Sequence, residues 1–505
     1  GLGGTIIPSI VTYGFDLDHK EVPVNFDTLS PAALTQNTHF TCEYLNLVAE
    51  DSHDEADRQL AWARMGEGTA FYHGKPNAFS YVPRIFGKDT REFFANLAQT
   101  THSIMTKVLD AYAHDQEIRK LFRFDPRVEK LVSLPAPYDL ALPLTRVDFM
   151  LDETTGDFHF CEFNTDASSG MDETRNATNA VCDTRPYQEF LARHQCTNDL
   201  GALFEGWVQT FLELARSCEC ARVDDSPSDE QPRSDRPLHV GIVVCLEDPH
   251  PHIGELQTYA ELFEAAGVSC SIYDARELAF DGTTLTGKHA YFGKDNAQID
   301  VIWRFCIVVD LLKYWDEVQP LIEAVEHFAV PMIGAFNTQI VHDKQLFALL
   351  RHPNMQALFT PEERAFIADH IPETHFLDEP GLDIAAIAAN PHDWVLKPTD
   401  WYASINVVAG PECSPDEWKL HLDQAVQNPE TSYIVQRFYP PSQTSTIPIY
   451  GNPADFEAAP TSVGNLFGAY VYAGEFAGLY VRQGPHDVIG TARDGLVAPV
   501  LWAAE

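Results

Sequence analysis

Residues 145–170, TRVDFMLDETTGDFHFCEFNTDASSG, are the stretch of sequence from which both fold and function can be approached. Polar and apolar residues alternate over 145–151 and again over 158–164, and the turn-forming DETTGD lies between the two runs. This pattern predicts a β-hairpin. Because side chains alternate between the faces of a strand, each strand has one chemically distinctive face. These faces are expected to present Arg146, Asp148 and Met150 on the first strand and Phe158, Phe160, Glu162 and Asn164 on the second.

The pairing of the two strands decides what this face can do. A register that pairs Met150 with Phe160 places Asp148 directly opposite Glu162, with Cβ atoms only about 4.5–5.5 Å apart. Two facing carboxylates repel unless one is protonated or a cation lies between them. Asn164 adds a neutral oxygen, and this ligand set suits Mg²⁺. The alternative is a solvated hairpin face with a charged tip, against which the apolar residues of both strands argue.

The overall composition describes a folded globular protein. At 505 residues the chain suggests two to four domains, and 45% hydrophobic residues are enough to form their cores. The formal net charge of −40 repels nucleic acid and anionic membranes and attracts cations, such as a polyamine substrate. Acidity of this kind is also a common solubility trait.

The cysteines and the apolar runs indicate a cytoplasmic location. Ten cysteines occur without a CxxC motif, which fits neither a zinc site nor a disulfide framework. No apolar stretch approaches the roughly 18 residues that span a bilayer. We therefore expect reduced thiols, and neither a membrane nor a nucleic acid as partner.

Changes in pattern along the chain divide it into five segments. Residues 1–135 form a mainly helical cap, 136–218 the first part of a catalytic core, and 219–237 a polar linker broken by three prolines. Strand–helix–strand order over 238–335 predicts a three-layer α/β domain. In its first helix Glu255 either faces a cleft at the strand ends or is an ordinary first-turn acid. Residues 336–505 mix short strands and helices.

Three polar side chains interrupt apolar strands in this last segment. Lys397 lies in VLKP, Gln436 in YIVQRF and Arg482 in GEFAGLYVRQ. A bare ammonium group inside an apolar strand is costly unless an anion pairs with it. The three residues therefore indicate one shared anionic ligand. Lys344, at the start of a predicted helix, would by itself be a surface lysine.

The order of these motifs resembles a known family. RxD, ExNxD, DK, VLKP, YIVQ and AGxxxR follow one another as in ATP-grasp ligases of the glutathionylspermidine synthase type, over about 136–505. The resemblance implies an α/β (α+β) ATP-grasp fold with a pre-ATP-grasp domain at 238–335. It also implies the circularly permuted motif order that eukaryotic glutathione synthetase shares. The amidase domain of some family members is absent from this sequence.

The resemblance also implies roles for single residues and the cofactors ATP and Mg²⁺. The resemblance implies that Asp148, Glu162 and Asn164 bind the metal and that Arg146 contacts the transferred phosphoryl group. ATP binding falls to Lys344, Lys397, Ser404 and Gln436, and stabilisation of the acyl phosphate or tetrahedral intermediate to Arg482. Substrate binding falls to Asp166, Ser169 and Glu255.

This chain departs from the family pattern in two places. No glycine lies between Lys397 and Gly410, where relatives have a glycine-bearing phosphate loop, and Ala167 stands where the synthase has a threonine–proline pair. The expected activity is ligation of a small-molecule carboxylate to an amine, releasing ADP and phosphate. One alternative is a degenerate protein that binds nucleotide or peptide without turnover. Another is a metal-dependent hydrolase that uses His250 and His252, although they lack the helical i, i+4 spacing of zinc hydrolases.

Overall fold

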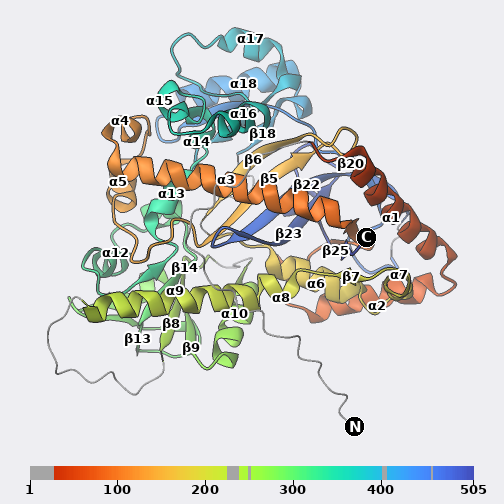
Figure 1. Ribbon diagram of the computed structural model, residues 1–505, viewed down its shortest axis with the longest axis horizontal. Coiled ribbons are helices and arrows are strands. Elements are labelled where there is room, and N and C mark those ends of the chain that lie inside the picture. Colours follow the sequence, from red (N-terminus) through yellow and green to blue (C-terminus); the bar gives the residue numbers. More distant parts are fainter. Residues whose placement is uncertain (1–27, 166, 225–237, 248–251, 401–405, 456–458) are drawn as a thin grey trace.

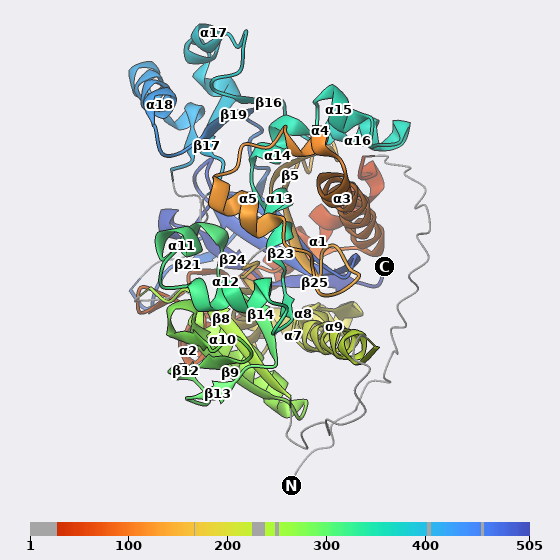
Figure 2. The same cartoon turned by 90° about the vertical axis from the view of Figure 1, so that its left-hand side faces the viewer.

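The computed structural model describes residues 28–165, 167–224, 238–247, 252–400, 406–455 and 459–505. In this part of the chain a central antiparallel sheet lies between two other regions (Figure 1). One is a parallel α/β layer, and the other is a small antiparallel sheet with its helices, residues 374–437, which we call the lid. Figure 2 shows the lid and the α/β layer at opposite ends of the molecule. The mixed α/β fold predicted from the sequence is thus present.

The central sheet joins strands from distant parts of the chain. Its order is β21–β3–β24–β23–β22–β5–β6, with β20 paired to β22. All pairs are antiparallel except β24 with β3. The strands are β3 (Phe79–Ser80), β5 (Leu144–Leu151), β6 (Phe158–Asn164), β20 (Gln443–Thr446), β21 (Pro448–Ile449), β22 (Thr461–Tyr472), β23 (Glu475–Gly484) and β24 (Leu496–Ala498).

One long helix covers a face of this sheet. Helix α3 (Lys88–His114) crosses it (Figure 1), and its Phe94 packs against the rings of Phe149, Phe467 and Trp502. Buried aromatic clusters of this kind supply much of the apolar area that stabilises a core. Trp502 belongs to β25 (Val500–Ala503), which pairs with β4 (Arg84–Phe86) and β7 (Cys196–Thr197). The core therefore includes parts of the predicted N-terminal cap.

The predicted hairpin forms from β5 and β6. Asp148 pairs with Glu162 and Arg146 with Asn164, as the sequence predicts. The predicted pairing of Met150 with Phe160 is wrong, because Met150 pairs with His159.

The cause is a β-bulge at Cys161. The register shifts between Asp148 and Phe149, which leaves Cys161 as the extra residue. The bulge also changes which side chains share a face. Phe158 and Phe160 are buried against Phe149, so they do not share the face of Glu162 as predicted. The extra residue, Cys161, thus places the aromatic side chains of β6 on the core face and leaves Glu162 on the polar face.

The α/β layer, within 238–335, has a sheet that is parallel except at one edge. Its order is β12–β9–β8–β14–β15; β8 pairs in parallel with β9 and β14, β14 pairs in parallel with β15, and the edge strand β12 pairs antiparallel with β9. The strands are β8 (His239–Val244), β9 (Ser269–Asp274), β12 (Ala290–Phe292), β14 (Val301–Arg304) and β15 (Met332–Ile333), beside a small sheet of β10 (Leu278–Phe280), β11 (Leu285–Gly287) and β13 (Ala297–Gln298). Its helices are α9 (Glu205–Asp224), α10 (Ile253–Ala265), α11 (Val308–Lys313) and α12 (Gln319–Glu326). Helix α9 includes residues 219–224, which the sequence assigned to the linker; residues 225–237 lie outside the described part.

The lid is a separate four-stranded sheet with its own small core. Its order is β16–β19–β17–β18, all antiparallel. The elements are β16 (Thr374–Phe376), α17 (Ile384–Ala389), β17 (Trp394–Pro398), β18 (Val408–Ala409), α18 (Pro415–Gln427) and β19 (Tyr433–Arg437). Trp418 of α18 is fully buried in this core. Short helices connect the lid to the α/β layer: α13 (Gln339–His342), α14 (Gln345–Leu349), α15 (Pro353–Gln356) and α16 (Pro361–His370).

The other α-helices and one pair of short strands complete the described part of the chain. They are α1 (Pro31–Glu50), α2 (Asp54–Glu67), α4 (Gln116–Arg119), α5 (Pro126–Val132), α6 (Met171–Val181), α7 (Arg185–Arg193), α8 (Leu200–Leu203) and the pair β1 (Phe71–Tyr72) and β2 (Lys75–Pro76). The expected helical character of the N-terminal segment is present. Among the described residues, none of the helices combines the length and apolar character that crossing a bilayer requires.

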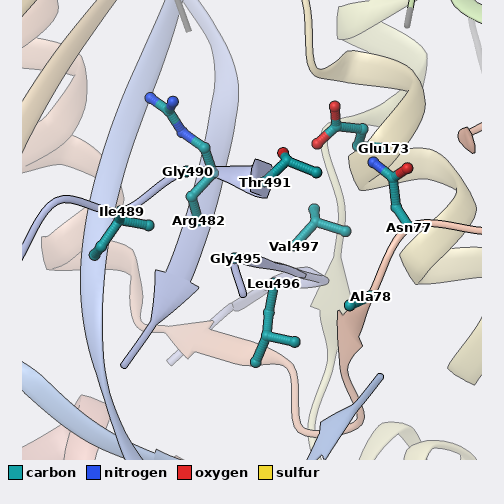
Figure 3. Close-up of a pocket in the computed structure, with 10 residues that line it drawn as sticks. All are labelled: Asn77, Ala78, Glu173, Arg482, Ile489, Gly490, Thr491, Gly495, Leu496 and Val497. Atoms are coloured by element: carbon teal, nitrogen blue, oxygen red, sulfur yellow. The ribbon is translucent and has the colours of Figure 1, made fainter. Parts of the chain in front are cut away.

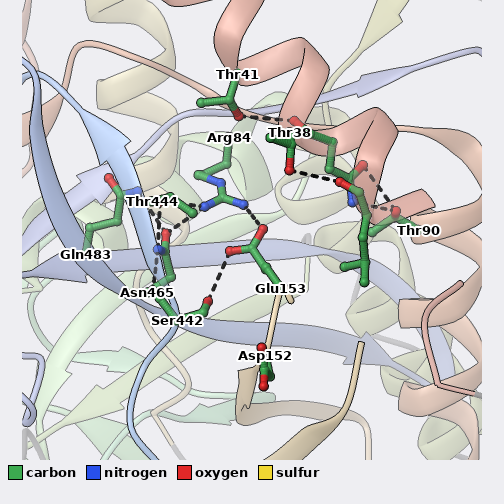
Figure 4. Close-up of polar contacts among 12 residues, drawn as sticks. Thr38, Thr41, Arg84, Thr90, Asp152, Glu153, Ser442, Thr444, Asn465 and Gln483 are labelled. Atoms are coloured by element: carbon green, nitrogen blue, oxygen red, sulfur yellow. Dashed lines mark hydrogen bonds and ion pairs between the residues drawn. The ribbon is translucent and has the colours of Figure 1, made fainter. Parts of the chain in front are cut away.

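A buried polar network ties the tip of the hairpin to this sheet (Figure 4). Arg84 of β4 forms an ion pair with Glu153 in the hairpin turn and donates to Thr444 at 2.8 Å and Asn465 at 3.0 Å. Glu153 also accepts a hydrogen bond from Ser442 at 3.1 Å. Arg84 is only 3% exposed, so these partners must offset the free-energy cost of burying its charged guanidinium group.

We expect Glu153→Gln to lower the free energy of unfolding by about 2 kcal/mol, because a buried guanidinium loses its counter-ion but keeps two neutral acceptors. Urea unfolding of the two proteins measures the difference. The control is Glu117→Gln, which breaks an exposed ion pair with Lys120 and should cost below about 0.5 kcal/mol. Equal costs for the two variants would contradict the assigned role of the network.

Candidate active site

A cleft lies between the hairpin and the lid. Its cavity volume is about 90 Å³. The lining side chains come from β5, β6, β17, β19 and β23, and they include Asp148, Glu162, Lys397, Gln436 and Arg482. Five residues that the sequence singles out thus reach one space, although the chain separates them by more than three hundred positions.

Asp148 forms the centre of an arginine cluster. Its carboxylate accepts hydrogen bonds from Arg146 Nε at 2.7 Å and Nη2 at 3.0 Å, and from Arg482 Nη2 at 2.6 Å. A fourth bond comes from Asn164 Nδ2 at 3.2 Å. Gly468 pairs with Asp148 on the neighbouring strand, and a Cβ there would lie 2.8 Å from the carboxylate. The glycine therefore leaves space for the carboxylate of Asp148 and the side chain of Arg146.

Glu162 forms a second charged contact on the same face. Its Oε2 lies 3.5 Å from Lys344 Nζ. Burial would raise the pKa of Glu162, but attraction to Lys344, Arg482 and Arg146 outweighs this effect and holds its pKa well below the usual range. The carboxylate is therefore ionised whenever the protein is folded near neutral pH.

Lys397 reaches the hairpin from the lid. Its Nζ donates to the carbonyl of Cys161 at 3.0 Å and to Gln436 Oε1 at 2.7 Å. Because Cys161 is the bulged residue, its carbonyl is available to the lysine. Gln436 in turn donates to Thr374 Oγ1 at 3.0 Å. Burial lowers the pKa of Lys397, so an anionic ligand beside it would be strongly attracted.

The site gathers basic side chains in a chain whose formal net charge is −40. Lys397, Arg437 and Arg482 line the cleft together with Asp148, Glu162 and Asp487. Arg146 and Lys344 form ion pairs with the carboxylates of Asp148 and Glu162. Basic groups held this close together attract a multiply charged anion such as a polyphosphate.

The oxygen atoms of this face fit a divalent metal in part. Asn164 donates a hydrogen bond from Nδ2 to Asp148. The side-chain oxygen of Asn164 and one oxygen of Glu162 therefore remain as hard ligands for a metal. Asp148 already accepts four hydrogen bonds, about the capacity of a carboxylate. It must release one donor before it binds a metal, so its predicted role as ligand stays a prediction. Among the described residues, no group of three or more His, Cys, Asp or Glu forms a metal site.

Two of the three predicted substrate residues lie next to this cluster. The carbonyl of Ser169 accepts from Arg146 Nη1 at 2.5 Å, and its hydroxyl lies 3.2 Å from His252 Nε2. Glu255 Oε2 accepts the N–H groups of Gly170 at 3.0 Å and Asp172 at 2.9 Å. Asp166, Ser404 and His250 lie outside the described residues.

Sequence reasoning missed two tyrosines at this site. The hydroxyl of Tyr470 donates to the carbonyl of Ser169 at 2.8 Å, and Tyr480 lies under the guanidinium groups of Arg146 and Arg482 at 5.3 and 5.1 Å. Tyr480 precedes Arg482 by two residues on β23. The two-residue periodicity of a strand places Tyr480 and Arg482 on the same face, and this signal in the sequence could have identified the tyrosine.

The buried carboxyl of Glu255 gives a prediction about pH. Burial raises its pKa to about 8. Between the unfolded value near 4.5 and this value, the folded protein holds a proton that the unfolded chain has released. Stability from this group therefore falls as pH rises through that range.

The isosteric variant Glu255→Gln does not titrate. We expect the unfolding free energy of Glu255→Gln, minus that of the parent protein, to increase by roughly 1 kcal/mol for each pH unit between pH 5 and 8. Urea unfolding at three pH values in that range measures the difference. The exposed substitution Glu189→Gln should give a nearly constant difference. A constant difference for Glu255→Gln as well would contradict the raised pKa.

Comparison with solved structures finds a likeness that extends over most of the chain. A glutathione synthetase-like effector from Globodera pallida, in its apo form, superposes with a TM-score of 0.54 at 11% identity, over 91% of this chain and 99% of that chain. The chain therefore has the fold of this glutathione synthetase-like protein, which agrees with the ATP-grasp fold that the motifs predict.

Two further likenesses are weaker. A putative γ-glutamylcysteine synthetase from Methylobacillus flagellatus gives a TM-score of 0.36 at 12% identity, over 78% of this chain and 84% of that chain. A RimK domain ATP-grasp protein from Sphaerobacter thermophilus gives 0.26 at 15% identity, over 52% and 90%. No family model and no curated protein sequence matches the chain.

Proposed function

We propose that the chain is an ATP-dependent carboxylate–amine ligase, which forms an amide through an acyl phosphate and releases ADP and phosphate. The observation that supports this proposal best is the cluster of four basic groups around Asp148 and Glu162, of which Lys397 and Arg482 line the cleft. A donor carboxylate from an amino acid or peptide, an amine or polyamine acceptor, and a glutathionylspermidine synthase-like subtype are further parts of the proposal.

The lysines take the role of phosphate binders. Lys344 and Lys397 approach the hairpin from two different segments, so a polyphosphate bound between them would link the lid to the central sheet. Gln436 accepts from Lys397 at 2.7 Å and thereby fixes the direction of the ammonium group. The resemblance implies that the strand segment opened by this glutamine contacts the adenine.

The arginines take the role of charge stabilisers. Asp148 holds Arg146 and Arg482 side by side, so both donor groups are oriented before a substrate arrives. Such preorganised donors stabilise charge on a transferring phosphoryl group and on an acyl phosphate. A Mg²⁺ ion held by Glu162 and Asn164, together with Asp148 once it releases a donor, would supply Lewis-acid neutralisation of phosphate oxygens.

The reaction then needs little covalent participation from the protein. The γ-phosphoryl group of ATP passes to an oxygen of the donor carboxylate, and ADP leaves. The amine nitrogen attacks the carbonyl carbon, the bond to the phosphate oxygen breaks, and the nitrogen loses its surplus protons. Closure of the lid over the cleft excludes water that would hydrolyse the acyl phosphate.

The cellular setting is also part of the proposal. Nine cysteines of the described residues are free thiols, and four of them are buried. Thiols in this number are typical of a reducing cytoplasm. We therefore place the enzyme there, with small molecules as its partners.

An assay of ADP release tests the proposal. The protein is incubated with ATP, Mg²⁺, glutathione and the twenty amino acids as carboxylate donors, and hydroxylamine as acceptor. Formation of ADP together with a hydroxamate would support a ligase, since hydroxylamine traps an acyl phosphate. Nucleotide binding without either product would overturn the ligase proposal and support the degenerate protein. Lys397→Met is the matched negative control.

A further inference from the structure

The loop that connects β23 to β24, residues 485–495, forms one wall of the cleft. Its residues Asp487, Val488 and Ile489 line the cleft together with Lys397 of the lid. The loop and the lid come from segments about ninety positions apart in the chain. Any contact between them therefore joins two walls of the space in which the reaction is proposed to occur.

Internal hydrogen bonds give this loop a fixed shape. The carbonyl of Gly490 accepts the N–H groups of Arg493 at 2.9 Å and of Gly495 at 3.1 Å. The other side of the loop faces Arg482 of β23. Figure 3 shows the small pocket between the loop and Arg482, whose lining includes Asn77, Glu173, Gly490, Thr491 and Gly495. The loop is thus a shaped element beside the arginine cluster.

On the lid, the residue that reaches this loop is Glu412. It ends a short turn, Gly410–Glu412, that follows β18. Ala409, immediately before the turn, pairs with β17. Gly410 lies closely against Pro391, since a Cβ at position 410 would lie 1.9 Å from the carbonyl oxygen of Pro391. The position of Glu412 is therefore fixed relative to the lid sheet.

Three hydrogen bonds join Glu412 to the loop, and we call them the clasp. Its Oε1 accepts the backbone N–H groups of Asp487 at 2.8 Å and Val488 at 3.2 Å, and its Oε2 accepts from Arg493 Nη2 at 2.6 Å. Arg493 Nη1 also donates to the carbonyl of Val488 at 3.4 Å. The side chains of Glu412 and Arg493 are 22% and 36% exposed, so water competes with the clasp and allows it to break and re-form.

We propose that Glu412 is a positioning residue that holds the lid against the β23–β24 loop while the acyl phosphate exists. This inference rests on the proposed ligase function and adds the contact that keeps the cleft closed. Because both ends of the clasp are fixed in their own elements, it sets the spacing between Lys397 on the lid and Arg482 beside the loop. When the clasp breaks, water enters and hydrolyses the acyl phosphate to the free carboxylate and phosphate, and no amide forms.

The ratio of ADP to hydroxamate tests this role. With hydroxylamine as acceptor, the parent protein should form equal amounts of both. Glu412→Ala should raise the ratio about threefold or more, because water then competes for the acyl phosphate. Glu412→Gln keeps an oxygen for the two N–H groups and loses only the ion pair, so its ratio should lie between the two. Glu430→Ala, an exposed change on the lid, should leave the ratio unchanged. An unchanged ratio for Glu412→Ala would overturn the inference.

Hydrogen exchange examines the clasp without any turnover. Mass spectrometry of peptides from residues 485–495 reports the amides of Asp487 and Val488. We expect Glu412→Ala to speed their exchange roughly tenfold and to leave the amides of β8 unchanged. Equal exchange in the variant and the parent protein would overturn the clasp while leaving the ligase intact. Absence of any hydroxamate with the parent protein would refute the ligase, and the exchange rates would still decide the clasp.

Discussion

Replacement of Arg482 by methionine is expected to lower kcat of the proposed ligase by about 10²- to 10³-fold, the effect of losing one preorganised donor to developing charge. The KM for ATP should change by no more than about threefold, because Lys344 and Lys397 keep their positions. Asp148 keeps its two bonds from Arg146, so the fold should persist. Initial rates of ADP release over a range of ATP concentrations give both constants.

Two comparison variants make this result specific. Arg91→Met removes a partly exposed arginine that pairs with Asp199 on another face, and it should leave kcat within about twofold. Arg482→Lys keeps the charge but loses the planar fork, so it should remain well below the parent protein. If Arg482→Met retained full kcat, the arginine cluster would have no part in the reaction.

The second large effect is expected for Asp148→Asn, which should lower the free energy of unfolding by about 3–5 kcal/mol. Asp148 is 1% exposed and binds two guanidinium groups, so its neutralisation removes the carboxylate to which both are hydrogen-bonded. Urea unfolding measures the loss. Activity should disappear as well, because neither arginine is then oriented.

A double-mutant cycle identifies the cause of that loss. Combining Asp148→Asn with Arg482→Met removes a repelling charge along with its partner, so the double variant should be more stable than the sum of the two costs by about 1–3 kcal/mol. Asp139→Asn, an exposed change before the hairpin, should lie within about 0.5 kcal/mol of the parent protein. Strict additivity would mean that the two side chains act independently.

The polar face of the hairpin was predictable because its signals are local. Alternation over 145–151 and 158–164 was enough to place Asp148 opposite Glu162. The bulge at Cys161 was not predictable, since both FHFCEFN and an unbulged strand show the same two-residue alternation. Its presence depends on the aromatic packing of Phe149, Phe158 and Phe160, which is a property of the assembled core.

Residues that meet only through the tertiary fold are hard to assign from their neighbours in the sequence. From its local pattern Lys344 reads as a surface lysine, and only the family resemblance assigned it to the site; it is buried against Glu162. Asn77 and Thr491 have no distinctive neighbours in the chain, and a parallel pairing of β3 with β24 brings their segments together. The space left by Gly468 is explained only by the approach of Asp148 and Arg146 from the neighbouring strand.

The placement of β3 next to β24 has a consequence for the order of events on the ribosome. Phe79 can pair with Val497 only after residue 497 has been synthesised, so the sheet that holds the arginine cluster remains open until then. The parallel layer, whose strands all fall within residues 239–333, forms from far shorter chain excursions and is complete long before. A nascent chain halted before residue 461 would therefore display the unpaired edge of β5, the kind of edge on which chains aggregate.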